Sequence, residues 1–319
     1  MARESSHADK VLEVTQSASA AARSTVAASW HRSARKHGLD PNDQRIPERL
    51  EQSGLHERRE ELETFLMVAA PRLDALFSLM GQSGCAVLLT NADGVILDQR
   101  MSASDASTFE SWGLCAGTDW SEAREGTNGI GTCLTENRRV IIHQGEHFFS
   151  RNTEMSCIDA PIYGPDGQIV GALDVSSARA DQTEAINRLI GAQVANTARA
   201  IEEAGFRAAF SNARIVVADC DNNESASLLA VDHHDLVIGA TRKARRAFGL
   251  VDSGPISALP ATDILGREDG PTGFERAERA AVIRALARAY GNVSMAARQL
   301  GVGRATLYRR MKRLGLGET

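Results

Sequence analysis

The hydrophobic pattern between Glu60 and Phe210 switches between a period of two residues and a period near 3.6 residues. β-rich runs joined by turn residues predict hairpins at 85–101, around Asn-Ala-Asp-Gly, and at 157–177, around Gly-Pro-Asp-Gly, with a further strand at 138–144. Helical patterns at 57–80 and 181–210 flank these strands, and Pro71 is expected to kink or split the first helix. Hairpins between helices predict an α+β domain with an antiparallel sheet.

The last part of the chain has the pattern of three helices. Residues 274–290 place apolar side chains at a helical period, and Gly291–Asn292 ends that helix. Ser294 is predicted as the N-cap of a short second helix, and Gly301 can supply the positive φ of a sharp turn before a third helix near Arg304. The side chains expected on the buried faces of the second and third helices are Ala296, Ala297, Leu300, Leu307, Met311 and Leu314.

Basic side chains crowd the third of these helices, outside its apolar stripe. A short helix, a glycine turn and a basic second helix are typical of a DNA-binding helix-turn-helix, in which the second helix enters the major groove. Arginine can bind guanine with two hydrogen bonds, and threonine can contact a base or a thymine methyl group. The alternative is a helical hairpin whose basic face is merely solvated.

The distribution of charge along the chain favours the DNA-binding interpretation of these helices. The 319 residues carry a net charge of −5, but residues 274–319 hold ten Lys and Arg against three Glu, which is +7 and leaves −12 for the remainder. An acidic body with a basic end indicates that only the end meets a polyanion.

Composition excludes several classes of protein. No apolar run approaches the roughly 20 residues that span a bilayer, and the polar N-terminus lacks the apolar core of a signal peptide, so we expect a cytoplasmic protein without membrane contact. Five widely spaced cysteines without a C-x-x-C motif predict free thiols rather than a disulfide framework or a zinc site. We expect no metal and no cofactor.

The stretch "GNVSMAARQLGVGRATLYRRMKRLGL" (291–316) resembles the Fis-type helix-turn-helix that closes many bacterial enhancer-binding regulators. The resemblance implies base-reading roles for Arg304, Thr306 and Arg309. It places five further side chains near the DNA backbone: Ser294, Arg298, Tyr308, Arg310 and Lys312. Gly303 departs from the polar capping residue usual in the family. Such domains dimerise through the long helix, here 275–289, so a palindromic site and a homodimer are expected.

The body resembles a GAF domain, a small-molecule sensor fold, and more specifically the sensory half of acetoin-catabolism-type regulators. The likeness is carried by "SWHRSARKHGLDPNDQRIPERL" (29–50), "EGTNGIGTCLTENRRVIIHQGEHF" (125–148) and "CIDAPIYGPDGQIVGALDVS" (157–176). A GAF pocket is expected between the sheet and residues 110–135. The candidate ligand-lining residues are Trp112, Trp120, Thr127, Asn128 and Cys157.

Each of these features also has a structural alternative. The two tryptophans fit core packing, and Cys157 fits the role of a small buried hydrophobe. "GTNGIG" lacks the context of a dinucleotide-binding loop, so a helix start packed tightly on the sheet is the better interpretation. His143 and His147 have the spacing of a metal pair, but they follow a strand and no third ligand is evident.

These features predict a multidomain chain: an N-terminal helical region (1–59), a GAF-like sensor domain (60–210), a reduced PAS-like module (215–265), a linker (266–273) and an all-α Fis-type helix-turn-helix (274–317). Acetoin-type regulators usually carry an ATPase module before the helix-turn-helix. This chain has four lysines, none of which follows a glycine, so it has no G-x-x-x-x-G-K-[ST] motif.

The function expected from the sequence is a ligand-responsive transcription regulator without ATPase activity. Its implied partners are double-stranded DNA, a small-molecule effector, a second copy of the chain, and RNA polymerase if it activates by direct contact. An alternative is a heterodimer partner or competitor of a full-length, ATPase-containing relative. Methionine sulfoxide reduction, known in some GAF domains, needs a reactive cysteine with a partner thiol, and no close cysteine pair is visible, so we expect no enzyme.

Overall fold

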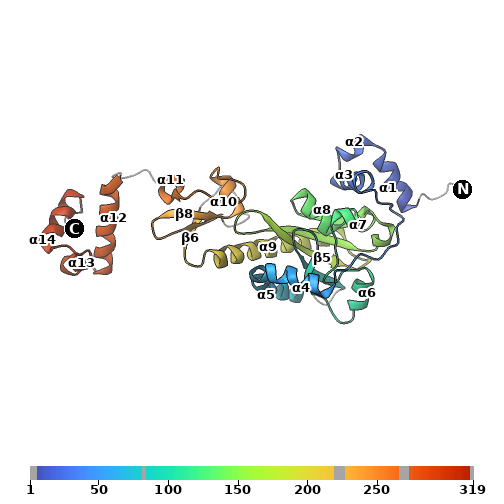
Figure 1. The fold of residues 1–319 in the computed structure, drawn as a ribbon, viewed down its shortest axis with the longest axis horizontal. Coiled ribbons are helices and arrows are strands. Elements are labelled where there is room, and N and C mark those ends of the chain that lie inside the picture. The colour runs from blue at the N-terminus through green and yellow to red at the C-terminus, as the bar shows by residue number, and fades with distance from the viewer. Residues whose placement is uncertain (1–5, 81–83, 219–226, 266–272, 317–319) are drawn as a thin grey trace. The chain divides into compact units, whose positions relative to one another are not determined.

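The computed structural model describes residues 6–80, 84–218, 227–265 and 273–316. Its contacts divide the chain into two compact units, Met1–Ile264 and Leu265–Thr319. The first unit holds two antiparallel sheets with their helices, and the second unit holds three helices (Figure 1). Most of the predicted linker 266–273 lies outside the described residues, and Gly273 already begins a helix.

The larger sheet contains five antiparallel strands in the order β2-β1-β5-β4-β3. These strands are β1 (Cys85–Thr90), β2 (Ile96–Arg100), β3 (Val140–His143), β4 (Ser156–Tyr163) and β5 (Ile169–Ser177). Both predicted hairpins and the predicted single strand are confirmed. β4 and β5 are buried along nearly their whole length, because helices cover both faces of the sheet.

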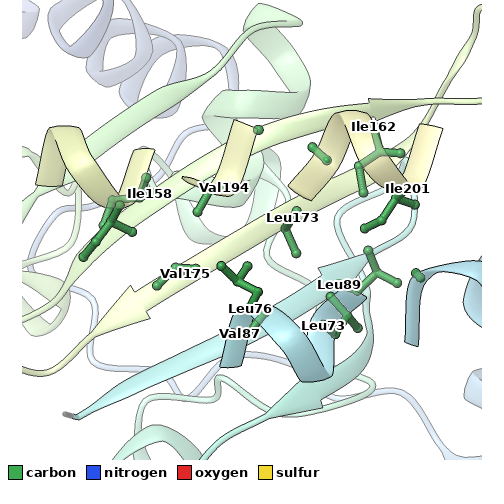
Figure 2. Packing of buried hydrophobic residues seen from close by; sticks show 14 of the residues in the cluster. Leu73, Leu76, Val87, Leu89, Ile158, Ile162, Leu173, Val175, Val194 and Ile201 are labelled. Carbon is green, nitrogen blue, oxygen red and sulfur yellow. The ribbon is translucent and has the colours of Figure 1, made fainter. Parts of the chain in front are cut away.

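Two long helices, α5 (Glu63–Met80) and α9 (Glu184–Ala209), cover one face of this sheet (Figure 1). Figure 2 shows Leu73 and Leu76 of α5 and Val194 of α9 packed against Leu173 and Val175 of β5. The other face lies under α6 (Ala106–Ser111) and α8 (Gly129–Glu136). The short elements α7 (Glu122–Glu125), η2 (Gln144–Glu146) and η3 (Ser150–Asn152) lie in the connecting segments. The predicted α+β domain with flanking helices is confirmed.

The helical segment before the sheet is interrupted at Leu62, not at Pro71. A separate helix, α4 (Gln52–Glu61), ends there, and α5 continues through Pro71. Pro71 lies on the exposed side of α5, as does Met67 four residues earlier. The hydrogen bond that proline cannot make is therefore lost on the side where water can serve the free carbonyl. The predicted split at Pro71 is wrong.

The helix α9 belongs to two hydrophobic cores. Ile190, Val194 and Ile201 pack on the five-stranded sheet, whereas Phe206 at its far end packs against Leu228 of the second sheet. That second sheet has the strand order β6-β7-β8-β9. Its elements are β6 (Arg214–Ala218), β7 (Ser227–Val231), β8 (Leu236–Ala240), α10 (Arg242–Ala247), β9 (Leu259–Pro260) and α11 (Ala261–Leu265).

The strands β7 and β8 pair antiparallel on either side of His233–His234, and α10 follows them. Sequence reasoning missed β6, a five-residue strand that directly follows the long helix. Whether residues 215–265 form a module of their own, as predicted, stays a prediction.

The N-terminal region contains α1 (His7–Thr15), α2 (Ala18–Ala21), α3 (Thr25–His31) and the π-helical turn η1 (Arg32–Lys36). Ser6 caps α1 through a capping box with Asp9, and Ser24 caps α3. Val11 and Trp30 bury their side chains against Phe148 and Phe149 of the domain that contains the five-stranded sheet. These helices are therefore packed on the domain that follows them.

The second unit contains α12 (Gly273–Arg288), α13 (Val293–Gln299) and α14 (Arg304–Arg313). Val282 and Ala285 of α12, and Ala289 just after it, pack against a core that contains the predicted side chains Ala296, Ala297, Leu300, Leu307, Met311 and Leu314. Gly301 has a φ of 66°, as the turn between α13 and α14 requires. The predicted arrangement of helix, turn and basic helix is confirmed.

The N-cap of α13 is Asn292 rather than Ser294. The Asn292 side-chain oxygen accepts hydrogen bonds from the backbone N–H groups of Ser294 (3.0 Å) and Met295 (3.1 Å). The prediction was wrong by two residues because Ser and Asn both favour this position, and only the backbone angles decide between them.

Replacing Asn292 with alanine is expected to destabilise α13 by about 1 kcal/mol, because two backbone donors lose their acceptor. Hydrogen–deuterium exchange of the full chain would show faster exchange of the amides at the start of α13. Ser294→Ala is the matched control, with an expected effect within about 0.5 kcal/mol. Faster exchange in Ser294→Ala than in Asn292→Ala would contradict the observed cap.

Candidate DNA interface and sensor core

The candidate DNA-binding side chains form the solvent-facing surface of α13 and α14. Arg304, Tyr308, Arg309, Arg310 and Lys312 of α14 and Arg298 of α13 are exposed, whereas Ser294 and Thr306 are partly buried. Gly303 is the N-cap of α14 and offers no side-chain hydrogen bond, so the first turn of the helix keeps free N–H groups. Free N–H groups at a helix start favour an anion such as phosphate.

The basic side chains of α14 differ in whether they already have a partner. Arg310 and Arg313 both pair with Glu278 of α12, and the distance from Arg310 Nη1 to Glu278 Oε1 is 3.2 Å. Arg304 lies 5.6 Å from the centre of the Tyr308 ring. In the part of the chain that the structure describes, Arg298, Arg309 and Lys312 have no ion pair or hydrogen bond through their side chains. These three cations are available to an external anion.

Large apolar side chains are exposed on α12 and in the turn that follows it. Phe274 in the first turn of α12 is 96% exposed and Ile283 is 40% exposed, and Tyr290, two residues beyond the helix, is 96% exposed. The predicted dimer contact through residues 275–289 agrees with this exposure, and it stays a prediction.

The five candidate ligand residues lie together on the α8 side of the sheet, but their side chains serve the fold. Trp120 is 1% exposed and donates from Nε1 to the Gly113 carbonyl (2.9 Å), and Trp112 packs edge-on against Phe109. Asn128 is the N-cap of α8, with its side-chain oxygen 2.8 Å from Gly131 N. Trp112, Trp120 and Cys157 also belong to the hydrophobic cluster on this side of the sheet.

The "GTNGIG" segment is a helix start pressed against the sheet, as predicted. A Cβ atom at Gly129 would overlap the side chains of Asp159 and Cys157, and one at Gly131 would overlap the backbone of Ser121 and Glu122. Only glycine allows α8 to approach this closely. The segment is therefore no phosphate-binding loop, and its glycines serve packing.

Residues 122–127, at and just before the start of this segment, also bind the N-terminal helices. Sequence reasoning missed these contacts. The Glu122 side chain is 2% exposed, and its two oxygens accept from Arg32 Nε (2.6 Å) and Nη2 (2.9 Å). Ser29 donates a further hydrogen bond to Glu122 (2.7 Å), and Thr127 donates to Ser29 (2.7 Å). Thr127, a ligand candidate, thus joins the N-terminal region to the sheet domain.

A cavity of about 650 Å³ lies between residues 37–48 and the elements α7 and η3. At its wall Arg151 pairs with Glu125, and burial outweighs this attraction and raises the pKa of Glu125 to about 7. A second cavity, of about 280 Å³, is lined mainly by residues 121–135, within the segment 110–135 of the expected pocket, and a third, of about 500 Å³, is lined by α4, α5, β4 and α9. None of these three cavities is lined by a candidate ligand residue, so those five assignments stay predictions.

A polar cluster lies beside Cys157 in the buried sheet. The Cys157 Sγ atom is 3.4 Å from His147 Nε2 and 3.2 Å from Ser176 Oγ, and Ser176 donates to Asp174 (2.7 Å). Burial raises the pKa of the Cys157 thiol and lowers the pKa of His147 to about 4, so both groups are uncharged near neutral pH. A neutral thiol is a poor nucleophile.

The histidine pair does not form a metal site in the described residues. His143 Nδ1 lies 2.6 Å from Ser156 Oγ, and His147 Nδ1 lies 3.0 Å from the Gln144 carbonyl, so both rings have protein partners. No group of three or more His, Cys, Asp or Glu side chains in the described ranges is placed to hold a metal ion.

Comparison with known families identifies both ends of the chain. The family model "MimR, N-terminal domain" matches residues 4–200, more than half of the sequence. The chain belongs to the MimR N-terminal domain family. The model of the bacterial regulatory proteins of the Fis family matches residues 273–314. The C-terminal unit of this MimR-type protein is therefore a Fis-type helix-turn-helix, as the sequence predicted.

Several curated relatives of this MimR-type chain are regulators of transcription. It is 29% identical over 243 residues to the acetoin catabolism regulatory protein of Cupriavidus necator, covering 75% of this chain and 36% of that protein. It is 31% identical to the acetoin dehydrogenase operon transcriptional activator AcoR of Bacillus subtilis, over 48% of this chain and 25% of that protein. The chain thus matches only a quarter to about a third of these relatives' lengths.

A further relative is the propane 2-monooxygenase operon activator MimR of Mycolicibacterium smegmatis, 30% identical over 49% of this chain and 26% of that protein. The E. coli DhaR(N)–DhaL complex resembles the fold, with a TM-score of 0.53 and 16% identity over 75% of this chain and 80% of that chain. The family thus confirms the resemblance to acetoin-type regulators with a sensor domain and a Fis-type helix-turn-helix. No helix among the described residues is long and apolar enough to cross a membrane.

Proposed function

We propose that this MimR-type chain is a transcription regulator that binds a palindromic DNA site as a dimer and responds to a small molecule through its sensor domain. The observation that carries the proposal is the set of unpaired cations on α13 and α14 in an otherwise acidic protein. Arg304, Thr306 and Arg309 would read bases, and the other candidates would hold the phosphate backbone.

Regulation without ATP hydrolysis is part of the proposal. The sequence has no G-x-x-x-x-G-K-[ST] motif, and only residues 201–272 separate the two family matches. The protein would therefore act by occupying DNA, and it would repress by blocking polymerase or activate by touching it. We infer a cytoplasmic, non-enzymatic protein, and buried, neutral Cys157 supports the absence of thiol catalysis.

The first experiment selects genomic DNA fragments on the purified full chain and titrates the best fragment against a random duplex. A specific site is expected to bind at least about 10³-fold more tightly than random DNA. Equal binding of all fragments would contradict the proposal, because purely electrostatic binding shows no sequence preference.

Two substitutions on α14 separate base reading from backbone binding. Arg309→Ala is expected to weaken binding to the selected site by about 1–3 kcal/mol per half-site, roughly 5- to 150-fold, and to weaken binding to random DNA much less. Lys312→Ala, the matched control of equal charge change, should weaken both by the same factor and reduce the salt slope by about 1. Identical behaviour of the two variants would remove the assigned base-reading role of Arg309.

The second candidate function is a heterodimer partner or competitor of a full-length, ATPase-containing relative. The exposure of Ile283 on α12 and of Tyr290 just after it favours this candidate equally, because a partner with the same helix could cover these side chains. Co-expression of two differently tagged copies of this chain, followed by recovery of one tag, distinguishes the homodimer from the heterodimer. Recovery of tagged pairs of this chain supports the homodimer, and recovery of a longer MimR-type protein in their place supports the heterodimer.

A further inference from the structure

The cavity of about 650 Å³ has walls from two parts of the first unit. Residues 37–48 of the N-terminal region form one wall, and α7 and η3 of the sheet domain form the other. Small-molecule sites have volumes of roughly 300–1,000 Å³, so its size is typical. Leu39, Ile46 and Phe149 supply apolar side chains to the walls, and Ile46 is 79% exposed. The cavity can therefore take in the apolar part of a small organic molecule.

The helix α7 carries two buried glutamates, Glu122 and Glu125, which are 3% and 4% exposed. Both oxygens of Glu122 are occupied, because Arg32 donates to each of them and Ser29 donates to one. Glu125 accepts from Arg151 through Oε2 alone, and among the described residues no donor is bound to its Oε1. Glu122 is therefore a complete structural contact, whereas Glu125 keeps one oxygen without a partner at the wall of the cavity.

Arg151, also at this wall, has unused hydrogen-bond donors. A guanidinium has five N–H donors. Arg151 donates from Nη2 to Glu125 and from Nη1 to the Asp43 carbonyl (3.0 Å), and its Nε makes no hydrogen bond in the part of the chain that the structure describes. The guanidinium carbon lies 4.0 Å from the centre of the Phe149 ring, and this stacking holds the group in place. The cavity thus has both an unused donor group and an unused carboxyl oxygen at its wall.

The net charge of the walls depends on the protonation of Glu125. Three ion pairs line the cavity: Arg45–Asp43, Arg124–Glu48 and Arg151–Glu125. Burial outweighs the attraction of Arg151 and raises the pKa of Glu125 to about 7. The charged groups that face Glu125 are Arg151 on η3, Asp43 and Arg45 on residues 37–48, and Asp119 before α7, and the cavity is lined in addition by His37, Glu48 and Arg124. With Glu125 protonated, three arginines face two carboxylates on the walls, so an anion is favoured there.

We propose that this cavity binds the carboxylate of a small apolar acid between Arg151 and Glu125. The carboxylate would accept hydrogen bonds from the unused donors of Arg151 and from protonated Glu125. Burial, together with repulsion from Arg45, lowers the pKa of Arg151, and an anion beside the two arginines offsets that repulsion. The apolar part of the acid would cover Leu39, Ile46 and Phe149. A cation would instead face the excess of arginine.

The bound acid would also hold the N-terminal region against the sheet domain, because each supplies one wall of the cavity. This gives a binding event a direct effect on how the two parts are joined. That the acid is the effector of the regulator rests on the proposed function, whereas its binding in the cavity does not.

The affinity for the acid is expected to fall as the pH rises through about 7. Ionised Glu125 repels the ligand and competes with it for Arg151, whereas protonated Glu125 donates to it. With a pKa of about 7, Glu125 is about nine-tenths protonated at pH 6 and about one-tenth protonated at pH 8, so the dissociation constant should rise roughly tenfold. A cation bound at Glu125 would show the opposite trend.

The test is isothermal titration calorimetry of the full chain with sodium benzoate, which stays ionised over this pH range. Benzamide and benzylammonium chloride are the neutral and cationic comparisons of similar shape. The expected result is saturable binding of benzoate alone, roughly tenfold weaker at pH 8 than at pH 6, with uptake of about one proton at pH 8. No saturable benzoate binding, equal binding of benzamide or benzylammonium, or an affinity that does not fall between pH 6 and pH 8 would overturn the proposal.

Glu125→Gln keeps a donor and an acceptor at this position but cannot ionise. The variant is expected to bind benzoate at pH 8 as tightly as the unchanged protein does at pH 6, without proton uptake. Glu184→Gln is the matched control, because the Glu184 side chain is 82% exposed, and it should keep the tenfold pH dependence. Persistent pH dependence in Glu125→Gln would overturn the site. These titrations contain no DNA, and the DNA selection contains no acid, so each proposal can fail without the other.

Discussion

Replacing Leu307 with alanine is expected to abolish sequence-specific DNA binding by unfolding the helix-turn-helix, with no change in the unfolding of residues 1–264. Leu307 is 0% exposed and lies in the core shared by α12, α13 and α14. Truncating a buried leucine costs about 2–5 kcal/mol. A unit this small rarely holds more than about 3–5 kcal/mol of stability, so little or none remains.

The measurement is thermal unfolding followed by circular dichroism, together with titration of the selected DNA site. Met295→Ala is the matched control, because Met295 lies in the same unit but is 40% exposed. It should keep the transition of the helix-turn-helix and the DNA affinity. If the Leu307→Ala variant still bound the selected DNA site tightly, the three-helix core would not be needed to hold α14 in its DNA-binding position.

Removing the Glu122 carboxylate is expected to release the N-terminal helices from the sensor domain. The Glu122→Ala change leaves Arg32 without its bidentate partner and Ser29 without its acceptor. Breaking a buried ion pair costs about 3–5 kcal/mol, and the low end applies because Arg32 is 25% exposed and keeps Glu136 at 2.8 Å. For a unit of this size, the Tm should fall by about 6–12 °C.

Limited proteolysis of Glu122→Ala should then cut first within α1 to α3, since these helices lose their anchor. The matched control is Glu184→Ala, which removes an exposed partner of Arg188 (3.0 Å, side chains 66% and 82% exposed) and should cost about 0–1 kcal/mol. Similar melting and cleavage of the two variants would show that the buried pair does not hold the N-terminal region.

The strands and the C-terminal helices were predictable because local pattern determines them. Alternation and the Asp-Gly turns at 93–94 and 166–167 located both hairpins, and the spacing of Leu307, Met311 and Leu314 located the buried face of α14. The interruption at Leu62 was not predictable, because whether proline breaks a helix depends on which side faces solvent. The cap at Asn292 was missed because two capping residues stand two positions apart.

Long-range pairings were beyond sequence reasoning altogether. Nothing local in "EGTNGIG" indicates that Thr127 and the nearby Glu122 meet Ser29 and Arg32, some 90 residues earlier. Asp159 and Asp174, which lie opposite each other in the sheet, are 15 positions apart, and only the register of β4 and β5 brings them together. The five candidate ligand residues were chosen by position, and the structure places all five in hydrogen bonds or packing that single-residue reasoning does not reveal.

The helix α9 packs in two hydrophobic cores, and its continuity between them has a consequence for motion within the first unit. Its 26 residues form a rod of about 39 Å with no loop between the part that packs on the five-stranded sheet and Phe206, which packs on Leu228. Gly239 of β8 also sits against the ring of Phe210, where a Cβ atom would overlap it. Because α9 is continuous between these two contacts, a displacement of β4 or β5 along the helix axis is expected to move the second sheet as well.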